Sequence, residues 1–142
     1  RVLFDLKDFL YEGLILREKD YRTALKEFDW NQFSDKYVAL TCTADAIVPT
    51  WAFMLAATRL APHVKKVVFG DLVALETAIY QEVIAALPLE SYRDQRVVVK
   101  GCSDLPVPVA AYIELTNALR PVVKSIMYGE PCSTVPLYKR AD

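Results

Sequence analysis

The sequence predicts an α/β fold in three layers, in which an open parallel sheet lies between helices. One observation is a repeat: a segment recurs 59 positions further on, so that Asp45 falls on Asp104 and Pro49 on Pro108. Another is that each copy reads as strand, helix, strand, a unit whose strands pair in parallel with a right-handed crossover. Finally, the 142 residues are 54% hydrophobic and 25% charged, which suits one folded domain with a sizeable core.

The repeat extends over the whole strand–helix–strand segment. Cys42 matches Cys102 when Ala44 is counted as a one-residue insertion. The further matched pairs are Val48 and Val107, Ala52 and Ala111, Leu60 and Leu119, Pro62 and Pro121, Val64 and Val123, Lys65 and Lys124, and Gly70 and Gly129. A repeat of this kind predicts the architecture and the place of a site, but it predicts no reaction.

Composition excludes several classes of function. The net charge of −1 lacks the basic excess of a nucleic-acid-binding protein. The longest nearly apolar run, Ala46 to Ala57, is too short to span a bilayer. No signal peptide is visible, although the chain begins at Arg1 rather than at Met, so residues upstream are expected. Three cysteines, an odd number, favour reduced thiols in the cytoplasm over a secreted disulfide framework.

The N-terminal segment, residues 1–36, is expected to cover the repeated core, and it has no counterpart in the repeat. Residues up to Leu6 read as a short extended stretch. A short helix is predicted from Asp5, which caps it, to Tyr11, and Gly13 ends it. A longer amphipathic helix is predicted over Glu18–Phe28, followed by a polar loop that contains Trp30.

The first copy occupies residues 37–70. Strands are predicted over Tyr37–Thr41 and Lys66–Phe69, with a helix over Pro49–Leu60 between them. This helix has almost no polar face and includes Trp51, which reads as a core residue. A helix that is apolar all round must be buried all round, so residues 1–36 or a second subunit should cover it.

The second copy occupies residues 96–130, after a linking helix and loop over residues 71–95. It is predicted to contain strands over Arg96–Lys100 and Val122–Tyr128 and an amphipathic helix over Val107–Leu119. The last residues, 131–142, are expected to form a tail. If a pseudo-two-fold axis relates the copies, the four repeat strands, counted along the chain, lie in the order 2-1-3-4.

In that arrangement three thiols meet at one edge of the sheet. Cys42 and Cys102 directly follow the two central strands, and Cys132 follows the fourth strand. Adjacent strands lie about 4.8 Å apart, and the crevice at their C-terminal ends is where such sheets bind ligands. Convergent thiols are typical ligands of a metal ion or an iron–sulfur cluster. The neighbouring polar residues expected to contact a ligand are Thr43, Asp45, Ser103 and Asp104.

Each of these residues also has a structural interpretation. Asp45 and Asp104 are equally well placed to cap the helices that follow them. A free cysteine is often a small buried core residue, and the chain has no Cys-x-x-Cys pair. His63 is not expected to be a ligand, because the first-copy helix separates it from Cys42 by about 18 Å.

The sequence resembles a bacterial family known as domain of unknown function 2480. The residues that carry the resemblance are the segments 42–51, 65–70, 100–104 and 125–133, and the likeness covers the whole chain from Arg1. Members of the family are longer at the N-terminus. The resemblance implies no established activity. It suggests a link to iron–sulfur cluster assembly, because the genes of the family tend to lie beside that machinery.

Three hypotheses follow. The first is a cytoplasmic protein that binds a metal ion or an iron–sulfur cluster through Cys42, Cys102 and Cys132, with iron–sulfur assembly proteins as partners. The second is a non-catalytic interaction module, whose apolar first-copy helix and edge strands form a homodimer or a partner interface and whose cysteines are structural. The third is an enzyme with a cysteine nucleophile, which the lack of a histidine base at that edge disfavours. All three expect no nucleic acid and no membrane.

Overall fold

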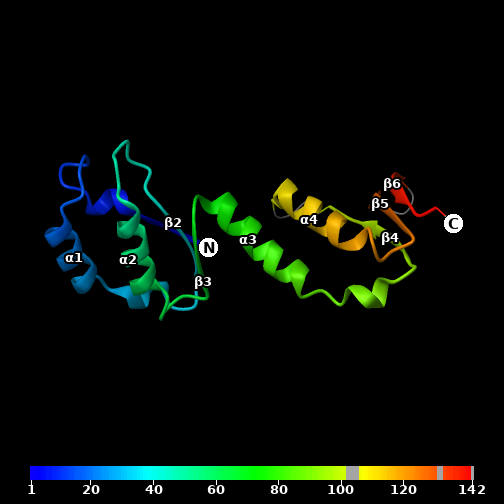
Figure 1. Cartoon of the computed structure of the whole chain (residues 1–142), viewed down its shortest axis with the longest axis horizontal. Helices are drawn as coiled ribbons and strands as arrows, with labels where there is room; N and C mark the ends of the chain where they lie inside the picture. Colours follow the sequence, from blue (N-terminus) through cyan, green and yellow to red (C-terminus); the bar gives the residue numbers. More distant parts are fainter. Residues whose placement is uncertain (102–105, 131–132, 142) are drawn as a thin grey trace. The chain divides into compact units, whose positions relative to one another are not determined.

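The computed structural model describes residues 1–101, 106–130 and 133–141 (Figure 1). Strands and helices alternate along the chain, and the described residues form four α-helices and two three-stranded sheets. Contacts divide the chain into two compact units, Arg1–Leu75 and Glu76–Asp142. The protein is therefore a mixed α/β protein, as the sequence predicts.

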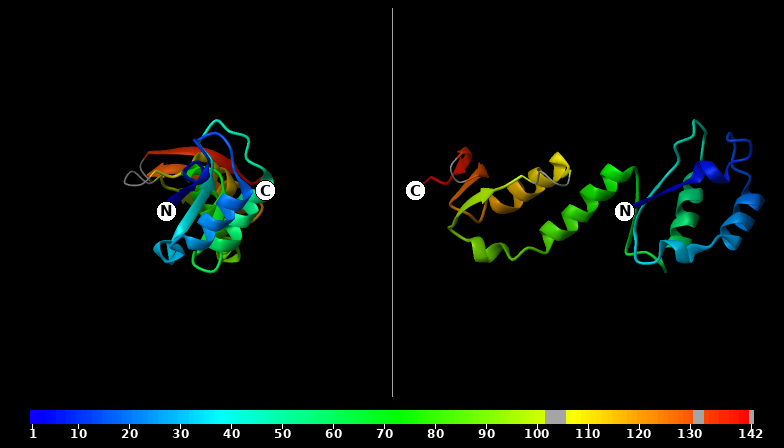
Figure 2. Two further views of the ribbon diagram at one scale, coloured as in Figure 1. Left: turned by 90° about the vertical axis from the view of Figure 1, so that its left-hand side faces the viewer. Right: turned by 180° about the vertical axis from the view of Figure 1, so that it is seen from behind.

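The first unit is built on a parallel sheet in the order β1-β2-β3. Its α-helices α1 and α2 lie on the same side of this sheet (Figure 2), where their buried residues share one core with those of the strands. This is what right-handed crossovers between successive neighbouring strands produce. Its elements are β1 (Val2–Asp5), the 3₁₀ helix η1 (Leu6–Phe9), α1 (Glu18–Glu27), the 3₁₀ helix η2 (Trp30–Phe33), β2 (Tyr37–Thr41), α2 (Thr50–Leu60) and β3 (Lys66–Phe69).

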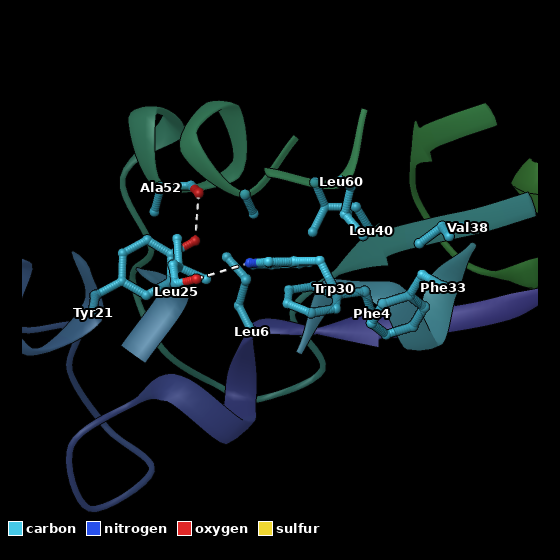
Figure 3. Close-up of a cluster of buried hydrophobic side chains, with 11 residues drawn as sticks. Phe4, Leu6, Tyr21, Leu25, Trp30, Phe33, Val38, Leu40, Ala52 and Leu60 are labelled. Atoms are coloured by element: carbon cyan, nitrogen blue, oxygen red, sulfur yellow. Dashed lines mark hydrogen bonds between the residues drawn. The ribbon is translucent and has the colours of Figure 1, made fainter. Parts of the chain in front are cut away.

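Aromatic side chains fill the core of the first unit (Figure 3). Trp30 is 8% exposed, and its Nε1 donates a hydrogen bond to the Leu25 carbonyl oxygen at 2.8 Å. The hydroxyl of buried Tyr21 donates to the carbonyl oxygen of Ala52 at 2.6 Å. Burial raises the pKa of Tyr21. The indole and the phenol are therefore buried without an unpaired polar atom, which is the condition for their burial to stabilise the fold.

Helix α2 is less enclosed than its composition predicts. Its residues Ala52, Ala56 and Leu60 are buried, whereas Met54 is 64% exposed. Trp51, expected in the core, is only half-buried, and its ring centroid lies 6.2 Å from that of Tyr21. Within the first unit, α1 covers one side of α2 and leaves another side open.

The predicted strand order is not found. The first copy does pair β2 with β3 in parallel, but the other edge of β2 pairs with β1, with Val2 opposite Val38 and Phe4 opposite Leu40. The strand at residues 96–100 was expected at that edge. The N-terminal strand β1 pairs there instead. The segment that contains α1 connects β1 to β2 as a crossover, and Val2 and Phe4, two positions apart on the strand, both face the core.

The second unit contains a mixed sheet in the order β4-β5-β6. Strands β4 and β5 are parallel, as predicted, and β5 and β6 are antiparallel. The residues expected to be a tail thus include a seven-residue strand. Pro136 in that strand lies beside a register irregularity, as suits a residue without a backbone donor. After α3 (Leu72–Ala85), the elements are the 3₁₀ helix η3 (Leu89–Tyr92), β4 (Arg96–Val99), α4 (Val109–Leu119), β5 (Ser125–Glu130) and β6 (Ser133–Lys139).

The repeat is visible in the backbone. Helices α2 and α4 differ by 59 positions at both ends, and so do the registers that pair Tyr37 with Lys66 and Arg96 with Ser125. The match reaches further upstream than the sequence indicates, since η2 and η3 are also 59 positions apart.

Two aspartates show the same extension of the repeat. Asp35 and Asp94 both have a φ of 61°, a conformation that Asp tolerates better than most residues. The Asp35 amide donates to the His63 carbonyl at 2.9 Å, and the Asp94 amide donates to the Val122 carbonyl at 3.0 Å. The expectation that residues 1–36 lack a counterpart is therefore wrong for this stretch. Side chains there have diverged while the backbone hydrogen bonds remain.

Candidate functional site

Cys42 and Thr43 directly follow β2, at the C-terminal end of the first sheet. Cys42 is a free thiol, half-buried against the core of this unit. The Thr43 amide and hydroxyl donate to the two carboxylate oxygens of Asp5, at 3.1 and 2.5 Å. Asp5 ends β1, and its carboxylate also accepts the Lys7 amide at 3.0 Å, as the predicted helix cap. One carboxylate thus ties the ends of two neighbouring strands together beside the thiol.

The hydrogen bonds stabilise the ionised form of Asp5. Burial raises the pKa of this carboxyl, but the hydrogen bonds from Thr43 and Lys7 together outweigh burial, so that the pKa lies below its usual value. The sequence analysis did not find this contact. It joins residues 38 positions apart and exists only because β1 pairs with β2.

Replacing Asp5 by Asn is expected to lower the free energy of unfolding by about 1–2 kcal/mol at pH 7. Because the folded-state pKa is lowered, this contribution is present above the unfolded pKa of about 3.9 and is lost as the pH falls through the folded pKa. Urea unfolding of both proteins at pH 7 and pH 3 measures it. The neighbouring exposed carboxylate supplies the control, Asp8→Asn, which should change little at either pH. A wild-type advantage over Asp5→Asn that is equal at both pH values would contradict this account.

Asp45 is exposed and does not cap α2. That helix begins at Thr50 with Pro49 in the capping position, without a side-chain cap, and the Ala52 amide donates to the Pro49 carbonyl at 3.0 Å. The aspartate that does cap a helix is Asp71, whose carboxylate accepts the Ala74 amide at 2.8 Å as α3 begins. The capping interpretation therefore does not apply to Asp45, which remains a candidate ligand.

The C-terminal ends of β4 and β5 lie side by side in the second unit, with Val99 paired to Tyr128. Gly101 passes so close to Tyr128 that an added Cβ would collide with the Tyr128 hydroxyl. Gly129 has a φ of +115°, and an added Cβ would lie 2.8 Å from the Ser133 carbonyl oxygen. Glycine is therefore required at position 129, where the backbone has a positive φ and meets a carbonyl oxygen, whereas a side chain at position 101 would require Tyr128 to move.

Cys102, Ser103, Asp104 and Cys132 lie outside the described residues. Among residues 1–101, 106–130 and 133–141 there is no group of three or more His, Cys, Asp and Glu side chains suited to a metal ion. His63 precedes β3 and bonds to the end of α2 through its amide, which donates to the Leu60 carbonyl at 2.9 Å. It therefore lies at the opposite end of the parallel sheet from Cys42, as predicted.

The chain is a mixed α/β protein, and each of its compact units contains two parallel strands joined through a helix. The chain belongs to the domain of unknown function 2480 family: the family described as "Protein of unknown function (DUF2480)" matches residues 1–140. The resemblance seen in the sequence is thereby confirmed. No curated protein and no solved structure gives a significant match. Among the described helices, none has the length and apolar character needed to cross a membrane.

Proposed function

We propose that the protein binds a thiophilic metal ion or an iron–sulfur cluster through cysteines placed beyond the ends of parallel strands. The pairing of β4 with β5 carries the proposal. Because the two strands are parallel, their C-terminal ends meet at one edge of the sheet. Cys102 comes three residues after Val99, and Cys132 two residues after Glu130. Both thiols are therefore proposed to lie beyond the same edge.

The donor set fits such a ligand. Thiolates are soft donors that select zinc, copper(I) and iron–sulfur clusters over hard cations. Cys42, the third predicted ligand, follows β2 in the other unit, and its membership of the site is a prediction that its replacement tests. Three thiolates leave one coordination position open. We propose that Asp45 or Asp104 occupies this position, or that it stays open so that a bound cluster can be transferred to another protein. A reducing cytoplasm, with iron–sulfur assembly proteins as partners, is the proposed setting.

Purification without oxygen, followed by metal and acid-labile sulfide determination, tests this function. We expect a metal close to stoichiometric with the protein, accompanied by sulfide if the centre is a cluster. Protein that carries no metal after anaerobic purification, takes up neither zinc nor iron with sulfide, and whose three thiols react slowly with alkylating reagents would overturn the proposal.

A second candidate, a homodimeric interaction module, is favoured by the edges of the two sheets. Among the described strands, β3 and β4 each pair on one side only. Unpaired strand edges readily accept another strand, and apolar side chains are exposed on both: Phe69 of β3 is 69% exposed and Val98 of β4 is 38% exposed. Light scattering after size exclusion should then give the mass of a dimer. A monomer at every concentration up to the millimolar range excludes this candidate.

A further inference from the structure

We propose that the second sheet carries a binding site for a small organic anion that joins a carboxylate or phosphate group to an apolar body. A cavity of about 510 Å³ opens on the face of this sheet, within the second unit. It is lined by Arg96, Lys124, Ser125, Met127, Pro136, Leu137, Tyr138 and Lys139. The site involves none of the cysteines and is independent of the function proposed above.

The cavity lies on the face of the sheet that faces away from α4. Val97, Val99 and Ile126 pack into the core that α4 covers. Side chains alternate between the two faces of a strand, so Arg96 and Val98 of β4 belong to the opposite face. Ser125 and Met127 of β5 share that face with them, because Ser125 pairs with Arg96 and Met127 with Val98.

Two cations flank a small residue at one end of this face. Ser125 pairs with Arg96 on one side and with Lys139 on the other, so that the three residues form one row across the sheet. Ser125 is 7% exposed and is too short to fill the space between its long neighbours. Lys124, directly before it, adds a third cation to the lining. The row therefore presents positive charge around a hollow.

Apolar residues form the adjoining part of the cavity. Met127 lies one row further along β5 and pairs with Pro136 of β6, and Leu137 follows. A ligand bound here meets cations at one end and apolar surface at the other. That division selects an amphipathic anion over an inorganic ion, since the apolar body gains burial while its charged group gains charge-assisted hydrogen bonds.

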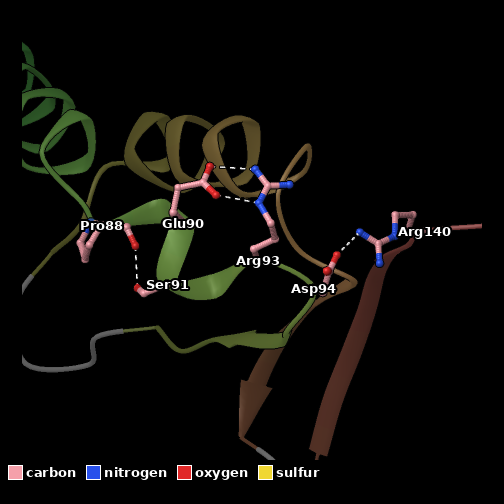
Figure 4. Close-up of polar contacts among 6 residues, drawn as sticks. All are labelled: Pro88, Glu90, Ser91, Arg93, Asp94 and Arg140. Carbon is pink, nitrogen blue, oxygen red and sulfur yellow. Dashed lines mark hydrogen bonds and ion pairs between the residues drawn. The ribbon is translucent and has the colours of Figure 1, made fainter.

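The charges of the cavity are not balanced from within. None of the eight lining residues is a carboxylate. The positive charge of Lys124 contributes to lowering the pKa of the nearby carboxylate of Asp94. That carboxylate already accepts a hydrogen bond from Arg140 at 2.6 Å, and this bond is the largest cause of the lowered pKa (Figure 4). Arg93 likewise donates two bonds to Glu90, at 2.6 and 2.7 Å. Arg93 and Arg140 are thus paired with carboxylates, whereas none of the residues that line the cavity supplies a carboxylate to its cations.

The first unit provides an internal comparison. Shifted by 59 positions, Arg96 corresponds to Tyr37, Lys124 to Lys65, and Ser125 to Lys66. There the guanidinium carbon of Arg1 lies 5.2 Å from the centroid of the Tyr37 ring, and the Lys65 ammonium lies 5.9 Å from it. An aromatic ring thus receives these cations in the first copy. In the second copy, Arg96 stands in place of this ring and Ser125 in place of the long side chain of Lys66, so that a hollow lies beside the cations.

Fluorescence of anilinonaphthalene sulfonate, an anion with an apolar body, measures binding to the full chain. The uncharged phenylnaphthylamine serves as the matched probe without the charge. We expect wild-type protein to bind the sulfonate more tightly than the neutral probe. Arg96→Gln and Lys139→Gln should each weaken sulfonate binding about tenfold, the usual loss of one charge-assisted hydrogen bond. Both variants should leave the neutral probe unaffected.

A control and a filled variant complete the test. Lys19→Gln, an exposed cation on α1, should bind the sulfonate as wild type does. Arg96→Tyr introduces the residue found at the equivalent position of the first unit, Tyr37, and should abolish binding. If this variant does not fold, Lys139→Gln, a change at an exposed residue, still tests the proposal. Displacement of the probe by phenyl phosphate or by benzoate identifies the preferred charged group. Equal affinity for both probes, or binding unchanged in Arg96→Gln and Lys139→Gln, would overturn the proposal.

Discussion

Trp30→Ala is expected to lower the free energy of unfolding by about 3–5 kcal/mol, the usual cost of removing a buried aromatic side chain. The indole of Trp30 packs against Phe28 and Phe4, with ring centroids 4.7 and 5.3 Å away. Its hydrogen bond to Leu25 links η2 to the end of α1. Truncation leaves a cavity between several aromatic rings and also removes the donor for a buried carbonyl, so both losses act in the same direction.

The second tryptophan supplies the control. Trp51→Ala removes a ring that is only half-buried and whose centroid lies 5.6 Å from the guanidinium carbon of the exposed Arg22, so its loss should cost clearly less. Both tryptophans belong to the first unit, and each variant therefore keeps one fluorophore that reports on unfolding of that unit in urea. Equal costs for the two variants would show that η2 does not complete the core.

Cys102→Ser and Cys132→Ser are each expected to lower metal or cluster occupancy by more than about tenfold. Replacing a residue that only supports a metal ligand already lowers metal affinity about tenfold or more, and these changes remove a ligand itself. Serine is nearly the size of cysteine but stays protonated at neutral pH, so it cannot supply the soft thiolate that these metals select. Cys42→Ser should have the same effect if the three predicted ligands act together. Metal and sulfide content after anaerobic purification is the measurement.

His63→Ala is the matched control, because His63 lies at the other end of the first sheet from Cys42. It should leave the occupancy unchanged. Full occupancy in both Cys102→Ser and Cys132→Ser would exclude a thiolate centre at this edge, and the homodimeric module would then be the better account of the protein.

Local patterns in the sequence determined the elements of the repeat. The strands Tyr37–Thr41 and Lys66–Phe69 have the predicted bounds, and α2 begins one residue after the predicted start. These segments carry their own signals: short apolar runs for the strands, and prolines at the helix starts. The parallel pairing within each copy follows from the same information, because a helix between two strands leaves little alternative.

The candidate site was predicted in part. Asp5 was recognised as a helix cap, which the structure confirms. Its second role, as the acceptor for Thr43, was not, since no local pattern connects residues in separate strands. The cationic cavity was also missed. Arg96, Ser125 and Lys139 have no motif in common, and only the pairing of three strands places them in one row.

Only the tertiary structure decided which strands become neighbours. Four residues at the N-terminus, Val2–Asp5, and seven near the C-terminus, Ser133–Lys139, read as an extended stretch and a tail, yet each completes a sheet. Trp30 reads as part of a polar loop, yet it lies in the core. The physical reason is common to all three. Hydrogen bonds between strands and burial of a single aromatic ring depend on partners far along the chain, whereas periodicity and capping record only what the nearest residues favour.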